Sequence, residues 1–272
     1  MPITDPAAEA LLDAPAARIG PRSLVRHSLT IARRNLVQVR GNPQLLVFIA
    51  IQPVLFVLLF VYVFGGAISG SSRDYVQFVI PGIIVQTVVF GTVMTGIGLS
   101  EDLAKGIIDR FRSLPIARSA VLTWRILADS ARTAASVLVT SAVGMLLGFR
   151  LPAGPVAALG AFALAVGFGT AFAWIAATIG LTVRNPETAQ SAGFLWMFPL
   201  TFASAAFAPA ASMPGWLRPF VEANPITALT EALRALTTGG PVILPVLRSV
   251  AWIAGLTLVF APLAIHRYRR LA

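Results

Sequence analysis

Long apolar runs constrain this chain more than any other feature of its sequence. The first run, Leu45–Phe64, reads LLVFIAIQPVLFVLLFVYVF and contains no charged side chain. One helix needs about 20 mostly apolar residues to cross the hydrocarbon core of a bilayer. Five further runs lie near Val76–Leu99, Ala131–Phe149, Val156–Leu181, Ser191–Ala211 and Val242–Ile265. The pattern therefore predicts an all-α polytopic membrane protein with six transmembrane helices.

The composition supports this fold class and excludes several others. Hydrophobic residues make up 57% of the 272 residues and charged residues only 12%. That charged fraction is about half the value of an ordinary soluble domain. Intrinsic disorder requires the opposite composition. Because the chain has no cysteine, disulfide scaffolds, thiol catalysis and cysteine-ligated zinc are excluded as well.

The distribution of basic residues predicts the orientation of the chain. Its net charge is +10, which in a soluble protein would suggest a nucleic-acid partner. Sixteen of the 21 Lys and Arg residues instead lie before the first run, in every second loop, or after the sixth run. Basic loops concentrated on one side follow the positive-inside rule. We therefore expect both termini in the cytoplasm and no nucleic-acid partner.

Two predicted cytoplasmic segments outside the runs have amphipathic helical patterns. The first, about residues 22–40, predicts a helix along the membrane surface; the alternative is a plain topogenic arm. The second, Ser100–Leu114, predicts a helix that Ser100 caps and Pro115 ends. Its apolar stripe either contacts a partner or packs on the chain's own membrane domain.

A third amphipathic segment, Met213–Thr238, falls on the predicted outer side. Trp216 suits the membrane interface. Asn224 is expected to cap a helix that has Pro225 at its first position. Two charged residues three positions apart, Glu231 and Arg234, are expected to pair. The segment predicts a helix that dips into the outer leaflet or lies on it.

The sequence lacks the usual parts of a catalytic or metal site. The only lysine, Lys105, is followed by Gly106, so the Gly-Lys-Ser/Thr of a phosphate-binding Walker loop is absent. His27 and His266 lie in polar flanks without metal-ligand spacing. Every Asp and Glu lies in a loop, a tail or a helix margin, whereas proton-coupled carriers place carboxylates inside their spans. We expect no catalytic residue, no bound metal and an energy source outside this chain.

A few polar and aromatic residues fall inside the runs. Gln52 and Gln86 lie near mid-membrane, where they either line a substrate pathway or form interhelical hydrogen bonds. Aromatic residues crowd the fifth run, Phe198 among them, and suit either an apolar substrate or packing and lipid contact. Three residues on the third helix are spaced to pair along one face, namely Arg125, Asp129 and Arg132.

Two blocks of sequence carry a family resemblance. The first contains Glu101-Asp102, then GIIDRFRSLPIAR at residues 106–118, then Arg125 and Ala128-Asp129. The second runs from Phe202 to Arg234 and contains FAP at 207–209, MPGWL at 213–217 and NPIT at 224–227. Over about residues 20–270 the chain resembles the membrane subunit of ABC-2-type exporters, in particular the daunorubicin/doxorubicin-resistance permease group.

The resemblance implies a domain organisation. A flexible cytoplasmic tail at 1–20 would precede a single transmembrane domain of the type V exporter class at 21–272. Within that domain, about 22–40 would form the connecting helix, about 101–114 the coupling helix, and about 213–238 the extracellular re-entrant helices. In that re-entrant segment the residues of interest are Trp216, Asn224, Pro225, Glu231 and Arg234.

The resemblance also implies partners. A second permease subunit, the same chain or a homologue, would pair with this one. Two copies of a cytoplasmic ATPase would bind ATP and Mg, so that the complex, not this chain alone, would be an ATP-hydrolysing translocase. The coupling helix would contact the ATPase through Glu101, Asp102, Ile107, Arg110, Phe111 and Arg112. The pathway between subunits would be lined by the first, second and fifth helices, where position favours Gln52, Gln86 and Phe198.

The leading functional prediction is a bacterial plasma-membrane exporter subunit for hydrophobic or amphipathic compounds such as drugs, antibiotics or lipids. One alternative is export of a cell-envelope lipid or lipid-linked glycan. The other, from a different class, is a membrane scaffold or sensor that shares the fold and transports nothing.

Overall fold

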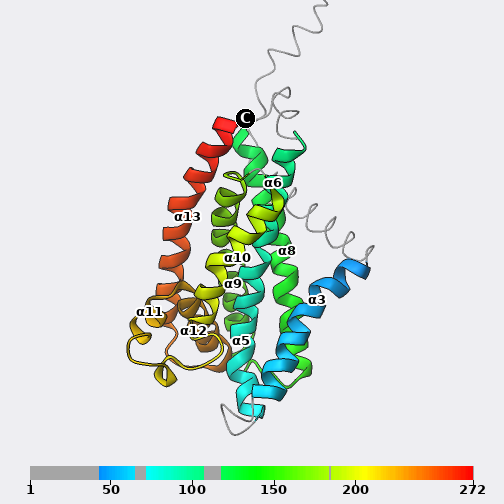
Figure 1. Ribbon diagram of the computed structural model, residues 1–272. Coiled ribbons are helices and arrows are strands. Elements are labelled where there is room, and N and C mark those ends of the chain that lie inside the picture. Colours follow the sequence, from blue (N-terminus) through cyan, green and yellow to red (C-terminus); the bar gives the residue numbers. More distant parts are fainter. Residues whose placement is uncertain (1–42, 65–71, 107–117, 184, 272) are drawn as a thin grey trace, which may run out of the picture. The chain divides into compact units, whose positions relative to one another are not determined.

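The computed structural model describes residues 43–64, 72–106, 118–183 and 185–271, and all their regular elements are helical. The predicted tail and connecting helix lie outside these residues. In chain order the elements are α3 (Pro43–Leu58), the π-helix η1 (Leu59–Phe64), α5 (Ser72–Gly91), α6 (Val93–Ala104), α8 (Arg118–Leu146), α9 (Pro155–Gly180), α10 (Pro186–Phe202), the 3₁₀ turn η2 (Ala210–Ser212), α11 (Arg218–Ala223), α12 (Pro225–Thr238) and α13 (Ile243–Leu271) (Figure 1).

Four of the described helices are long and apolar enough to cross a membrane: Tyr75–Ala104, Leu122–Leu146, Pro155–Gly180 and Ile243–Leu271. They correspond to the second, third, fourth and sixth predicted runs. α3 and η1 cover the first run, and α10 covers the fifth with only 17 residues. The structure therefore supports four spans by length and composition, and the total of six stays a prediction.

Two helix ends differ from the sequence prediction. Ser100 does not cap a new helix: it lies inside α6, and its hydroxyl donates to the Ile97 carbonyl at 3.0 Å. The helix continues because no Gly or Pro separates the apolar run from the acidic residues that follow, and it ends before Gly106, whose φ is +65°. α10 ends at Phe202, whereas the fifth run was predicted to extend to Ala211.

α9 lies at the centre of the packing. It contacts α5, α6, α8, α10, α12 and α13, and Figure 1 shows α13 running alongside it. At its crossing with α6, Gly180 and Gly96 meet backbone to backbone: a Cβ on Gly180 would overlap the Gly96 carbonyl, and one on Gly96 would lie 2.8 Å from the Ala176 oxygen. Small residues of this kind let membrane helices approach closely.

Side chains from α12 and its N-cap hold the non-helical backbone that follows α10. The Asn224 amide donates to the carbonyls of Leu200 and Ala203 at 2.7 and 2.8 Å. Thr227 Oγ1 accepts from the Ala205 N–H at 2.9 Å. Because an unsatisfied backbone group within a bilayer costs several kcal/mol, these bonds explain how α10 can stop short: side chains bind the Leu200 and Ala203 carbonyls and the Ala205 N–H.

Arg234 completes this set of contacts, which we call the carbonyl clamp (Asn224, Thr227, Arg234 and Tyr75). Its Nε donates to the Phe78 carbonyl at 3.0 Å and its Nη2 to the Ala206 carbonyl at 2.9 Å. The guanidinium carbon also lies 3.6 Å from the centroid of the Phe78 ring. The Tyr75 hydroxyl donates to the Phe207 carbonyl at 3.0 Å. The clamp therefore joins α12, α5 and the segment after α10.

The expected pairing of Glu231 with Arg234 is replaced by these carbonyl contacts. Spacing alone suggested the ion pair, but the guanidinium reaches carbonyls on two other segments.

We expect Arg234→Met to destabilise the protein by about 2–3 kcal/mol, because it leaves two buried carbonyls without a charged donor. The measurement is the unfolding midpoint of the purified chain in mixed micelles titrated with SDS. Arg248→Met is the matched control, since Arg248 is exposed on α13. Equal midpoints for the two variants would contradict the clamp.

We expect Gly180→Ala to cost about 1–3 kcal/mol, because the added methyl must push α9 away from the Gly96 carbonyl. The same SDS titration measures it. Gly255→Ala on α13 is the control, since an added Cβ there meets nothing within 4 Å. A Gly180→Ala protein as stable as the control would show that the α6–α9 crossing is looser than described.

Candidate functional site

Seven phenylalanine rings form a continuous chain of contacts, which we call the aromatic ladder. It is built from α3, η1, α5, α10 and the segment that follows α10, and its members are Phe56, Phe60, Phe90, Phe194, Phe198, Phe202 and Phe207. On α10 the three rings recur every four residues, so they share one helix face.

The ladder has defined ring geometry. Phe60 stacks on Phe207 with centroids 4.4 Å apart and an interplanar angle of 10°. Phe198 and Phe202 stack at 5.8 Å and 7°. Phe90 meets Phe198 edge to face at 5.1 Å and 83°. Because aromatic pairs in these arrangements attract one another, the ladder joins the first, second and fifth predicted spans.

Part of the ladder is exposed. Phe198 and Phe202 are 46% and 48% accessible, and Leu195 beside them is 80% accessible. On η1, Tyr62 is 68% accessible. A membrane helix that presents large apolar side chains contacts lipid, another protein or an apolar ligand. This exposed face is the candidate functional surface.

The structure separates the three predicted pathway residues. Gln52 on α3 is exposed, and Phe198 lies in the ladder. Gln86 is only 2% accessible, because α5 packs against α8, α9, α10 and α12. Neither of its amide atoms has a hydrogen-bond partner in the part of the chain that the structure describes. Between Phe78 and Gly91 only Gln86 and Thr87 are polar, so periodicity marks no interior face there and could not assign Gln86 to the interior.

Ion pairs join the predicted cytoplasmic ends of α6 and α8. Arg125 pairs with Asp102 across the two helices, and Asp129 pairs with Arg132 at 3.1 Å within α8. The predicted pairing of all three α8 residues along one face is therefore wrong for Arg125, whose partner lies on another helix. Sequence spacing reports only neighbours on the same helix.

The structure describes two of the six residues predicted for the coupling helix. Glu101 is half-buried and pairs with Lys105 at 3.0 Å, and Asp102 is half-buried and pairs with Arg125. Four others lie outside the described residues: Ile107, Arg110, Phe111 and Arg112. The contact of this segment with an ATPase stays a prediction.

The segment at Met213–Thr238 has the predicted local structure. The Asn224 side chain accepts from the Ile226 N–H at 2.8 Å, and Pro225 is the first residue of α12. Trp216 is 81% accessible, as expected for an interface residue. α12 itself is buried on most sides, between α5, α9 and α13, rather than lying on a surface. Its re-entry into the membrane stays a prediction.

In the described ranges, no group of three or more His, Cys, Asp or Glu residues could hold a metal ion. The site consists of aromatic and apolar side chains, with ion pairs at one end and the carbonyl clamp at the other.

Comparison with known proteins places these features in a family. The family model described as ABC-2 type transporter matches residues 27–237. The chain is 37% identical to the daunorubicin resistance ABC transporter permease protein of Streptomyces coeruleorubidus, over 90% of this chain and 87% of that protein. It is 29% identical to the probable doxorubicin resistance ABC transporter permease protein of Mycobacterium tuberculosis, over 94% and 93% of the two chains.

A more distant relative is the putative transport permease ycf38 of Cyanophora paradoxa, 27% identical over 78% of this chain and 74% of that protein. The family match covers more than half of the chain, and the similarity to the Streptomyces permease covers most of both proteins. The chain belongs to the ABC-2 type transporter family as a permease related to drug-resistance transporters.

Proposed function

We propose that this chain is the membrane-spanning subunit of an ATP-driven exporter that moves hydrophobic or amphipathic compounds out of a bacterial cell. The observation that carries the proposal is the aromatic ladder. Its ring contacts join the three elements expected to line the pathway, and its exposed rings, Phe198 and Phe202, stack on one face of α10. Planar apolar compounds bind well to such rings. The names of the relatives, which refer to daunorubicin and doxorubicin resistance, agree with that ligand class.

The proposed topology has six spans with both termini in the cytoplasm of the plasma membrane. α3 with η1 and α10 would supply the two spans that complete the four long helices. α11 and α12 would form the re-entrant segment. The carbonyl clamp supports this placement, because non-helical backbone at membrane depth requires internal partners for its polar groups.

The proposed energy source is a separate ATPase, present in two copies, that binds ATP and Mg. The chain has a single lysine and no Walker loop, so it needs such a partner. The coupling helix at about 101–114 would be its contact. A second permease, identical or homologous, would face the aromatic ladder and close the pathway.

The ion pairs suggest how force enters the membrane domain. Asp102 lies on α6 and Arg125 on α8, so a push on the segment after α6 would reach both helices together. α6 in turn meets α9 at the Gly96–Gly180 contact. Movement at the cytoplasmic end would then be carried by packed helices toward the ladder.

Removing one ring of the aromatic ladder tests the proposed substrate surface. We expect Phe198→Ala to weaken apparent affinity for daunorubicin about fivefold, the value of one aromatic contact of about 1 kcal/mol. The measurement is drug-stimulated ATP hydrolysis by the permease reconstituted with its cognate ATPase. Phe220→Ala is the control, because Phe220 is 51% accessible but lies outside the ladder. Unchanged stimulation in Phe198→Ala would refute the ladder's role.

Reversing one charge tests the coupling helix. We expect Arg110→Glu to reduce co-purification of the ATPase about thirtyfold if the residue is a hot spot worth about 2 kcal/mol. Membrane insertion should be unchanged. Arg269→Glu is the control, since Arg269 is exposed at the end of α13. Equal recovery of the ATPase with both variants would remove Arg110 from the interface.

A further inference from the structure

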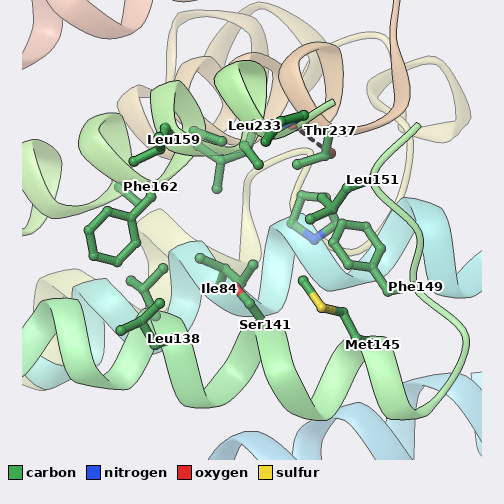
Figure 2. A pocket seen from close by; sticks show the side chains of 16 residues that line it. Ile84, Leu138, Ser141, Met145, Phe149, Leu151, Leu159, Phe162, Leu233 and Thr237 are labelled. Atoms are coloured by element: carbon green, nitrogen blue, oxygen red, sulfur yellow. Dashed lines mark hydrogen bonds between the residues drawn. The ribbon is translucent and has the colours of Figure 1, made fainter. Parts of the chain in front are cut away.

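A second apolar site lies away from the aromatic ladder. It is a cavity of about 530 Å³ between α5, α8, α9 and α12. Leu138 and Met145 of α8 form one wall, and Leu159 and Phe162 of α9 form another, with Leu233 of α12 above them (Figure 2). The volume falls within the range of small-molecule sites.

The cavity has almost no free polar group. Its hydroxyls belong to Ser141 and Thr237, and the Thr237 hydroxyl already donates to the Leu233 carbonyl at 2.7 Å. Several lining residues also face outward: Leu159 is 68% accessible and Leu138 is 59% accessible. Since α8 and α9 are candidate spans, the cavity opens toward the hydrocarbon of the bilayer, and its occupant must be apolar over most of its length.

The cavity follows α8, and a cationic residue lies beyond one end of it. Along α8 its lining residues run from Val137 to Met145, about 12 Å at 1.5 Å per residue. Beyond Met145, Phe149 and Leu151 line the end, and Arg150 lies between them with its side chain exposed. Among the described residues the Arg150 guanidinium has no ion-pair partner.

This end is held in place by α5. The Gln77 amide donates to the Gly148 carbonyl at 3.1 Å, and its oxygen accepts from the Arg150 N–H at 3.3 Å. In the proposed topology the α8–α9 connection faces the outer surface. In that topology an exposed arginine at the end of a span lies at the level of the lipid headgroups. A guanidinium binds the phosphate that every phospholipid carries, and its charge favours a headgroup with a net negative charge over one whose choline cation cancels that charge.

We propose that this cavity binds one acyl chain of an anionic phospholipid from the outer leaflet, with the headgroup at Arg150. The proposal rests on the orientation given under the proposed function. Lipid tails are as apolar as the cavity wall, so hydrophobicity alone gives no preference in a membrane. The shape of the cavity retains the acyl chain, and the charge of Arg150 selects the headgroup.

The test uses the full chain in nanodiscs that contain a phosphatidylglycerol with a photoactivatable acyl chain. Labelled peptides are mapped by mass spectrometry after illumination. We expect labelling to concentrate on residues 137–165 and to fall about tenfold in Ala158→Phe, which fills the cavity from α9. Ala163→Phe is the control, because Ala163 is exposed on the same helix but does not line the cavity. Ser141→Met fills the cavity from α8 and replaces Ala158→Phe if that variant does not fold.

The headgroup is tested by repeating the experiment with the matching phosphatidylcholine probe. We expect wild type to prefer phosphatidylglycerol by about two- to fivefold, the range of an exposed ion pair, and Arg150→Gln to lose the preference. Arg248→Gln, at another exposed arginine, should keep it. Labelling spread evenly over the outward-facing helices, or equal labelling of Ala158→Phe and Ala163→Phe, would overturn the site. A wild type without headgroup preference, or displacement of the probe by daunorubicin, would overturn the assignment to an anionic lipid. None of these readouts requires ATP hydrolysis, so they are independent of the transport tests.

Discussion

The need to satisfy backbone hydrogen bonds in an apolar medium controls the end of this structure that holds the carbonyl clamp. α10 stops at Phe202, and the chain continues through irregular backbone and the 3₁₀ turn η2 before α11. Its carbonyls are bound by Asn224 and Arg234, its amide at Ala205 by Thr227, and its Phe207 carbonyl by Tyr75. Four side chains thus supply hydrogen bonds that a continued helix would have supplied. They also position Phe207, whose ring belongs to the aromatic ladder.

The two ends of the membrane domain use charge differently. At the Asp102 end, charged side chains pair with each other, and the pair between Asp102 and Arg125 fixes α6 to α8. At the clamp, a single guanidinium binds carbonyl oxygens and an aromatic face. Between them lie apolar side chains and close glycine contacts. At both ends the charge is bound by neighbouring groups, a carboxylate for Arg125 and backbone carbonyls for Arg234, which offsets the cost of burying it.

The sequence predicted most of this fold and a smaller part of the site. The apolar runs located α8, α9 and α13, and the Asn-Pro pair located the start of α12, because these signals are local. The partners of Arg234 and Arg125 were not predictable, since they lie on other helices that no spacing rule connects. The burial of Gln86 was missed for a related reason: most residues around it on α5 are apolar, so the pattern marks no face as interior. The sequence revealed only the part of the aromatic ladder that lies on α10, as a cluster of aromatic residues. The rings on η1 and α5 are distant from that cluster in sequence.

The contact between Gly96 and Gly180 has a mechanical consequence. No side chain is interposed at this point, so the two backbones touch directly. Asp102 lies six residues from Gly96, about 9 Å along the axis, and Phe78 lies eighteen residues away in the other direction, about 27 Å. If α5 and α6 turn as one body, Phe78 travels about three times as far as Asp102 and in the opposite sense. Rotation about the Gly96–Gly180 crossing would thus convert a small displacement at the ion pair into a larger one at the carbonyl clamp.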